Sequence, residues 1–178
     1  VGDAAVTIKA DHHHRVLIGA GVTRGHGVAK MSEVGAAIAQ KDGDKIMDTL
    51  HRNPRLFDAD AFLLITATAG GTGSGATPII ARMLKERVAD RPVYAMAVLP
   101  FEHEEENEER SVFNTAVCLK SLSEVTDAVI LVDNQRYIGK DASAASNIQH
   151  INRLIVEPFF NLLCAGEEKN EQEEVPLV

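Results

Sequence analysis

The chain has little cysteine, few aromatic side chains and no long apolar run. Of its 178 residues two are cysteines, Cys118 and Cys164, too few for a disulfide framework or a paired-cysteine zinc site. This composition is typical of a protein from a reducing compartment. No stretch approaches the roughly 18 consecutive apolar residues that a membrane span requires, and the first residues lack the pattern of a signal peptide. We therefore expect a cytoplasmic protein without a membrane segment.

Basic residues are also in deficit, with 18 Lys and Arg against 26 Asp and Glu and a net charge of −8. Because nucleic acids bind to basic surfaces, we expect no nucleic-acid partner.

Three consecutive histidines, His12, His13 and His14, stand near the start of the chain. Adjacent side chains point in different directions, so we expect a solvated loop and no metal site there.

Short apolar runs alternate with segments of helical spacing. Within each run apolar residues follow one another without alternating polar positions, which predicts strands that are covered on both faces. These strands are expected at residues 16–19, 61–68, 93–99 and 128–132. Helices are expected at residues 32–50, 78–88, 108–122 and 141–164. Thr77 is a suitable N-cap for the second of these helices, and Pro78 stands at its first helical position.

This order predicts an α/β fold, a Rossmann-like and mostly parallel sheet with helices on both faces. We expect one domain over residues 1–166. Residues 167–178 are polar and acidic and are expected to form a disordered tail.

A glycine-rich segment, AGGTGSGAT at residues 69–77, joins the second expected strand to the next helix. Ligands of open parallel sheets bind at the carboxyl ends of the strands, and glycines let the backbone approach them closely. Free N–H groups and the helix dipole there favour an anion, most often a phosphate. The residues expected to bind phosphate are Gly70, Gly71, Thr72, Gly73, Ser74 and Gly75.

The segment matches neither of the two common phosphate motifs. No lysine follows the glycines as in a P-loop, and Ala76 stands where the dinucleotide fingerprint needs glycine. A flexible connection that binds nothing is the structural alternative.

The run GGTGSG between a strand and a helix resembles the phosphate loop of the tubulin/FtsZ superfamily, with Ala69 in the first of its three usual glycine positions. Residues 17–35 resemble the segment of that family that ends near the terminal phosphate, where Gly27 and Ala29 would offer backbone N–H groups and Lys30 would approach a phosphate or be solvated. Residues 155–168 resemble the archaeal tubulin-like CetZ branch more than FtsZ. The resemblance covers about residues 1–168.

The same resemblance assigns the rest of a nucleotide site. Glu104 and Arg110 would hold the ribose, and Glu102 or Glu106 could take the place of Glu104. The alternative interpretation is that residues 102–109, with six glutamates, form a solvated acidic loop. Three asparagines are assigned to guanine: Asn134, Asn147 and, one turn beyond Arg110, Asn114. An amide suits the guanine edge because it offers a donor and an acceptor together.

The resemblance implies a cytoskeletal GTPase that binds GTP or GDP with Mg²⁺, self-associates into filaments through the nucleotide site and acts in cell division or cell shape. Hydrolysis would be completed in trans, by an acidic residue that the next subunit contributes from a second domain. No residue of this sequence matches that acid convincingly, so no catalytic residue is assigned. The family's first strand, loop and helix would likewise precede residue 1. The alternatives are a non-hydrolysing phosphate-ligand module or a filament subunit without turnover.

Overall fold

The computed structural model describes residues 16–23, 27–53, 59–107 and 109–137, with three further positions at 152, 154 and 161. The chain divides into two units, residues 1–133 and 134–178. The expected helix at 141–164, the three histidines and the acidic tail lie outside the described residues, apart from those three positions. The expected boundary at residue 166 stays a prediction.

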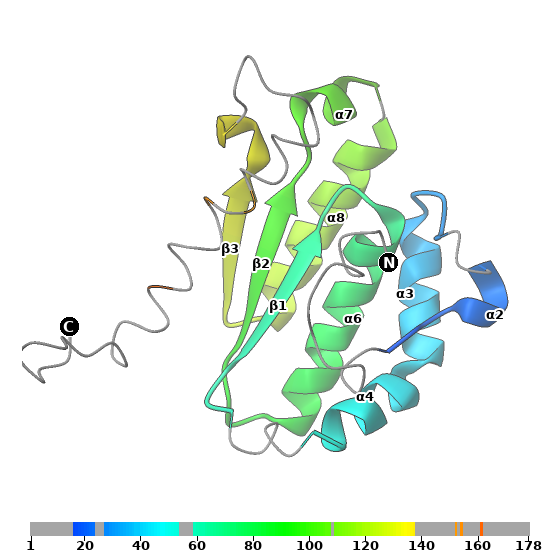
Figure 1. Cartoon of the computed structure of the whole chain (residues 1–178), viewed down its shortest axis with the longest axis vertical. Coiled ribbons are helices and arrows are strands. Elements are labelled where there is room, and N and C mark those ends of the chain that lie inside the picture. Colours follow the sequence, from blue (N-terminus) through cyan, green and yellow to red (C-terminus); the bar gives the residue numbers. More distant parts are fainter. Residues whose placement is uncertain are drawn as a thin grey trace, which may run out of the picture. The chain divides into compact units, whose positions relative to one another are not determined.

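The first unit contains a parallel sheet of three strands in the order β1-β2-β3 (Figure 1). The strands are β1 (Phe62–Ala67), β2 (Val93–Leu99) and β3 (Ala128–Asp133). Phe62 pairs with Val93, and Tyr94 pairs with Ala128, so the three carboxyl ends meet at one edge. Three of the four expected strands and their parallel arrangement are confirmed.

Two long helices, α6 (Gly71–Arg87) and α8 (Glu109–Val125), pack against the sheet. At the contact with α8, the small side chains of Ala95 and Ala97 of β2 meet Cys118 and Leu122, and these residues have no exposed surface. Burial raises the pKa of the Cys118 thiol to about 11, so it is protonated and inert at neutral pH.

The expected helix over residues 32–50 is two helices, α3 (Ser32–Lys41) and α4 (Gly43–His51). The break falls at Asp42, whose carboxylate accepts the Gly19 N–H at 2.8 Å. A Cβ at Gly43 would lie 2.5 Å from Cε of Met83, the end of a flexible side chain of α6, so α4 and α6 are in contact at this point. The apolar spacing predicted the helical content and missed the turn, because the pattern continues across it.

The expected strand at residues 16–19 is wrong. Residues 16–18 have no regular structure, Gly19 has a φ of +69°, and a short helix α2 (Ala20–Thr23) follows. Val16 and Ile18 pack on the core cluster that contains Ile46 and Met47. Their apolar character therefore reflects packing on a core and not pairing in the sheet.

Helix α6 begins at Gly71 and not at Pro78, so residues 71–77 are helical rather than a loop. Glycine is needed there because α6 lies against α3. A Cβ at Gly75 would overlap the Ser32 carbonyl oxygen, and one at Gly71 would lie 2.6 Å from the Met31 nitrogen. The glycines that the sequence predicts to form a phosphate-binding loop thus also serve helix packing.

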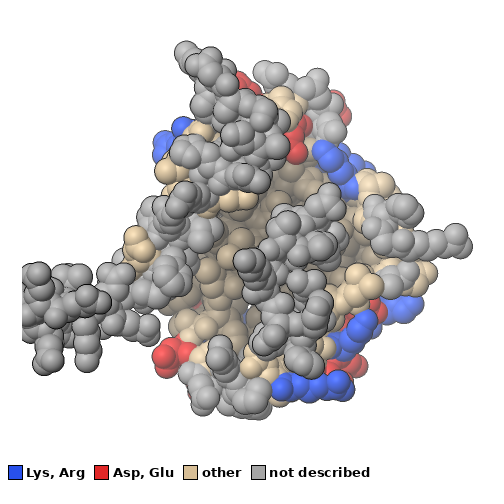
Figure 2. Space-filling view, in the orientation of Figure 1, with Lys and Arg blue, Asp and Glu red and all other residues tan. Residues whose placement is uncertain are grey.

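The acidic segment expected as part of a loop forms a short helix, α7 (Glu102–Asn107), before α8. None of the described helices is both long and apolar enough to cross a bilayer. On the face shown in Figure 2, the described residues over the strands are uncharged and the Lys, Arg, Asp and Glu side chains lie toward its edge.

Replacing Gly75 by alanine tests the α3–α6 contact. We expect Gly75→Ala to lower the free energy of unfolding by about 1–3 kcal/mol, because the added methyl group overlaps backbone of α3. Gly21→Ala is the matched control, since Gly21 is also helical and a Cβ there meets no described residue within 4 Å. Urea denaturation measures both variants, and equal stability of the two would contradict the packing account.

Candidate phosphate site at the strand ends

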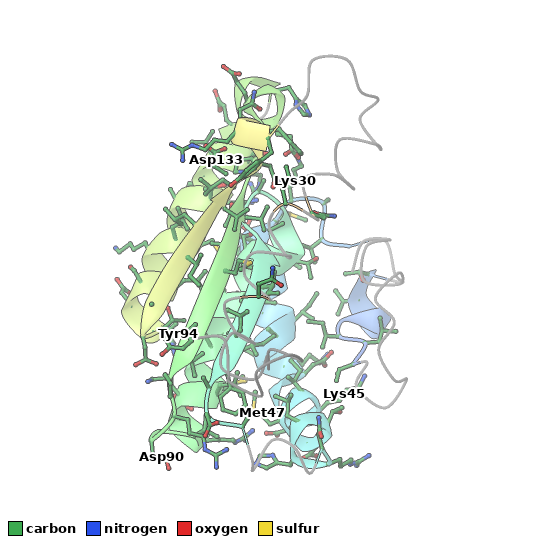
Figure 3. All side chains as sticks on the ribbon, turned by 60° about the vertical axis from the view of Figure 1, so that its left-hand side comes forward. Lys30, Lys45, Met47, Asp90, Tyr94 and Asp133 are labelled. Atoms are coloured by element: carbon green, nitrogen blue, oxygen red, sulfur yellow. The ribbon has the colours of Figure 1, made fainter. Side chains whose placement is uncertain are left out.

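The site residues that the sequence predicts in the first unit lie near the carboxyl edge of the sheet, where β1 leads into α6. In Figure 3, Lys30 and Asp133 lie toward this end and Asp90 lies at the other. Three segments meet here: the start of α6, the turn at residues 27–31 and the first half of α8. Open α/β sheets bind their ligands at this edge.

The N-terminus of α6 presents backbone N–H groups. Its N-cap is Gly70, with extended φ and ψ of −76° and 160°, and no side chain caps the helix. The first N–H groups of a helix, here those of residues 70–73, have no partner within it. A Cβ at Gly70 meets nothing among the described residues within 4 Å, so the space above this glycine is open. Together with the helix dipole, these groups are suited to an anion.

The other residues expected to bind phosphate fall into two groups. The Thr72 side chain is half-buried and has no hydrogen-bond partner among the described residues. The Ser74 side chain is buried, and its hydroxyl donates to the Gly70 carbonyl oxygen. A Cβ at Gly73 would lie 2.7 Å from the Ala67 carbonyl oxygen. Gly73 and Ser74 are therefore already fixed by contacts within the protein, as is Gly75.

The turn at residues 27–31 has an unusual backbone. Gly27, Ala29 and Lys30 have positive φ values of 74°, 48° and 59°. For residues other than glycine this conformation costs on the order of 1–3 kcal/mol each and persists only where the surroundings enforce it. Sequence reasoning selected Gly27 and Ala29 by resemblance and had no signal for the strain.

Helix α8 provides that enforcement. The Lys30 carbonyl oxygen accepts hydrogen bonds from Arg110 Nε at 3.1 Å and Asn114 Nδ2 at 2.9 Å. Lys30 Nζ donates to Ser111 Oγ at 3.1 Å, and the Arg110 guanidinium pairs with the Glu33 carboxylate. The pKa of Glu33 is lowered, first by a backbone N–H bond and then by Arg110. Glu33 therefore stays ionised and paired at neutral pH.

The two residues expected at the ribose have separate partners. Glu104 Oε2 accepts the Phe101 N–H at 3.0 Å, which caps α7 from its third position. Arg110 is bound to Glu33 and Lys30 as described. The structure does not bring these two side chains onto a common partner, and their ribose role stays a prediction.

The three asparagines expected at guanine differ in their surroundings. Asn134 directly follows β3 and starts a 3₁₀ turn (Asn134–Tyr137) in the second unit, and its buried Oδ1 has no partner among the described residues. Asn147 lies outside the described residues. Asn114 has no exposed surface, and its amide donates to Lys30 and also to the Ala69 carbonyl oxygen at 3.0 Å. That enclosure argues against base reading by Asn114.

The geometry defines a class: an α/β domain in which a helix N-terminus suited to an anion and a strained second loop lie at the carboxyl edge of a parallel sheet. The chain belongs to the tubulin/FtsZ family, because the family model described as "Tubulin/FtsZ family, GTPase domain" matches its residues 3–140. This membership confirms the family resemblance and the α/β fold expected from the sequence.

The similar proteins include archaeal CetZ proteins. The chain is 34% identical over 161 residues to tubulin-like protein CetZ1 of Haloferax volcanii, covering 89% of this chain and 39% of that protein. Its fold is similar to the solved structure of CetZ2 from Haloferax volcanii as a GTPγS-bound protofilament, with a TM-score of 0.79, 32% identity and coverage of 88% and 45%. It is also similar to the GDP-bound CetZ1 monomer, with a TM-score of 0.78, 31% identity and coverage of 92% and 47%. The chain thus spans less than half the length of these relatives.

Proposed function

We propose that this chain is the nucleotide-binding part of a polymer-forming, archaeal cytoskeletal GTPase that acts in the cytoplasm, in cell division or cell shape. The observation that carries the proposal is the open N-terminus of α6, where residues 70–73 present N–H groups and a Cβ at Gly70 would meet no atom of the described residues within 4 Å. The similar CetZ2 and CetZ1 structures are described as GTPγS-bound and GDP-bound. These descriptions support GTP or GDP as the ligand here.

The phosphates would be bound by dipoles and N–H groups rather than by a P-loop lysine. Gly70, Gly71 and Thr72 would contact one part of the phosphate chain, and the turn with Gly27 and Ala29 would contact another. Mg²⁺ would be bound mainly through phosphate oxygens, because this ion usually takes only one or two protein carboxylates beside them. When bound, the ion would neutralise phosphate charge.

The guanine base would be read by Asn134 and Asn147. Asn134 stands at the end of β3, and its buried oxygen still lacks a donor among the described residues. A buried acceptor without a donor is costly, so a ligand N–H group would be favoured there.

Self-association through the nucleotide site would complete hydrolysis in trans. The CetZ2 structure is a protofilament, which supports assembly of a similar kind. If the neighbouring subunit supplies the group that activates water, the GTPase rate per chain of the intact protein rises with its concentration. A rate that stays constant from dilute to assembling concentrations would contradict the in-trans step.

Gly70→Val tests the phosphate site without disturbing packing. The valine side chain would fill the open space above the α6 N-terminus, and we expect most of the GTP affinity to be lost. The free energy of unfolding should change by at most about 1 kcal/mol, the usual effect of a poorer N-cap. Calorimetric titration with GTP and Mg²⁺, alongside thermal unfolding, measures both. Undiminished GTP affinity in a folded variant would remove this helix N-terminus from the site.

Asn134→Ala tests base recognition. We expect GTP binding to weaken by about 1–3 kcal/mol, because the base loses a polar partner, while ATP binding hardly changes. Titrations of both nucleotides with the variant and the unaltered chain measure the difference. Equal weakening of GTP and ATP would show that Asn134 does not read the base and would favour a phosphate-ligand module without base preference.

A further inference from the structure

Asn114 of α8 connects two backbone segments that are far apart in the sequence. Its Nδ2 donates to the Lys30 carbonyl oxygen at 2.9 Å and to the Ala69 carbonyl oxygen at 3.0 Å. The first carbonyl belongs to the strained turn, and the second immediately precedes the N-cap of α6. One amide group thus uses both of its hydrogens to join the two loops of the phosphate site.

The chemistry of this contact selects asparagine. The side chain has no exposed surface, and its Oδ1 is buried without a partner among the described residues. A flipped amide would place Oδ1 against two carbonyl oxygens, so the network fixes its orientation. A side chain of similar shape without two N–H donors, such as aspartate or leucine, could not make this connection.

We propose that Asn114 is a positioning residue for the nucleotide's phosphate chain. It holds the turn at residues 27–31 in its left-handed conformation and against the start of α6, so that both segments face the same phosphates. The proposal rests on the proposed function, because it assigns Asn114 a role in that site. It replaces the guanine-reading role expected from the sequence, since Asn114 acts through Lys30 and Ala69 and does not itself touch the base.

The loss of Asn114 should affect the binding of the longer nucleotide, GTP, more than that of GDP. GTP engages both loops with its phosphate chain, and GDP depends less on the turn. Loss of Asn114 should therefore lower the affinity for GTP more than that for GDP. A general loss of stability, or a lost contact to guanine, would lower both affinities by the same factor.

The experiment compares Asn114→Ala with Thr115→Val by calorimetric titration of the full chain with GTP and with GDP. Thr115 is the matched control, because its Oγ1 bonds to the Ser111 carbonyl oxygen and to Thr68 Oγ1, and neither is a loop carbonyl that Asn114 holds. We expect Asn114→Ala to lower the ratio of GTP to GDP affinity by about tenfold, and Thr115→Val to leave it unchanged. An unchanged ratio in Asn114→Ala would overturn the proposal.

A second measurement uses the unaltered chain and tests the proposal even if the variant does not fold. We expect GTP to slow amide hydrogen exchange at residues 28–31 and 70–73 together. Protection confined to residues 70–73 would show that the two loops are not coupled and would overturn the positioning role. Failure of the unaltered chain to bind GTP at all would instead refute the proposed function.

Discussion

The close contact between α3 and α6 is the constraint on which the rest of the site depends. Glycine stands on both sides of this contact: a Cβ at Gly35 would overlap the Gly71 carbonyl oxygen, and one at Gly75 would overlap Ser32. Backbone atoms of the two helices therefore lie where side chains normally would. This close approach sets the position of the α6 N-terminus relative to the residues that lead into α3.

The turn at residues 27–31 follows from that contact. Gly71 lies against it, since a Cβ there would be 2.6 Å from both the Met31 nitrogen and Val28 Cγ2. The turn lies beside α6 in a strained backbone conformation, which hydrogen bonds from α8 stabilise. Backbone strain that is fixed by neighbouring elements is typical of functional sites. Two segments with backbone N–H groups are thereby held at one edge of the sheet.

Much of this architecture could be predicted from the sequence. Continuous apolar runs identified β1, β2 and β3, because strands of a parallel sheet are typically apolar on both faces. Only β2 is mostly buried among the described residues, whereas Ile65 of β1 and Leu131 of β3 are exposed there. The same criterion failed at residues 16–19, where Val16 and Ile18 are apolar because they cover a core. The start of α6 was missed because glycine is read as a helix breaker, and only the neighbouring α3 shows why Gly71 and Gly75 are helical. The role proposed for Asn114 depends on contacts with Lys30 and Ala69 that no local pattern contains.

The most direct test of the account is a crystal structure of this chain with GTPγS and Mg²⁺. The account predicts phosphate oxygens within hydrogen-bond distance of the N–H groups of residues 70–72, with the turn at residues 27–31 on the same phosphate chain. A nucleotide bound elsewhere, with the space above Gly70 open to solvent, would contradict the assignment of the site.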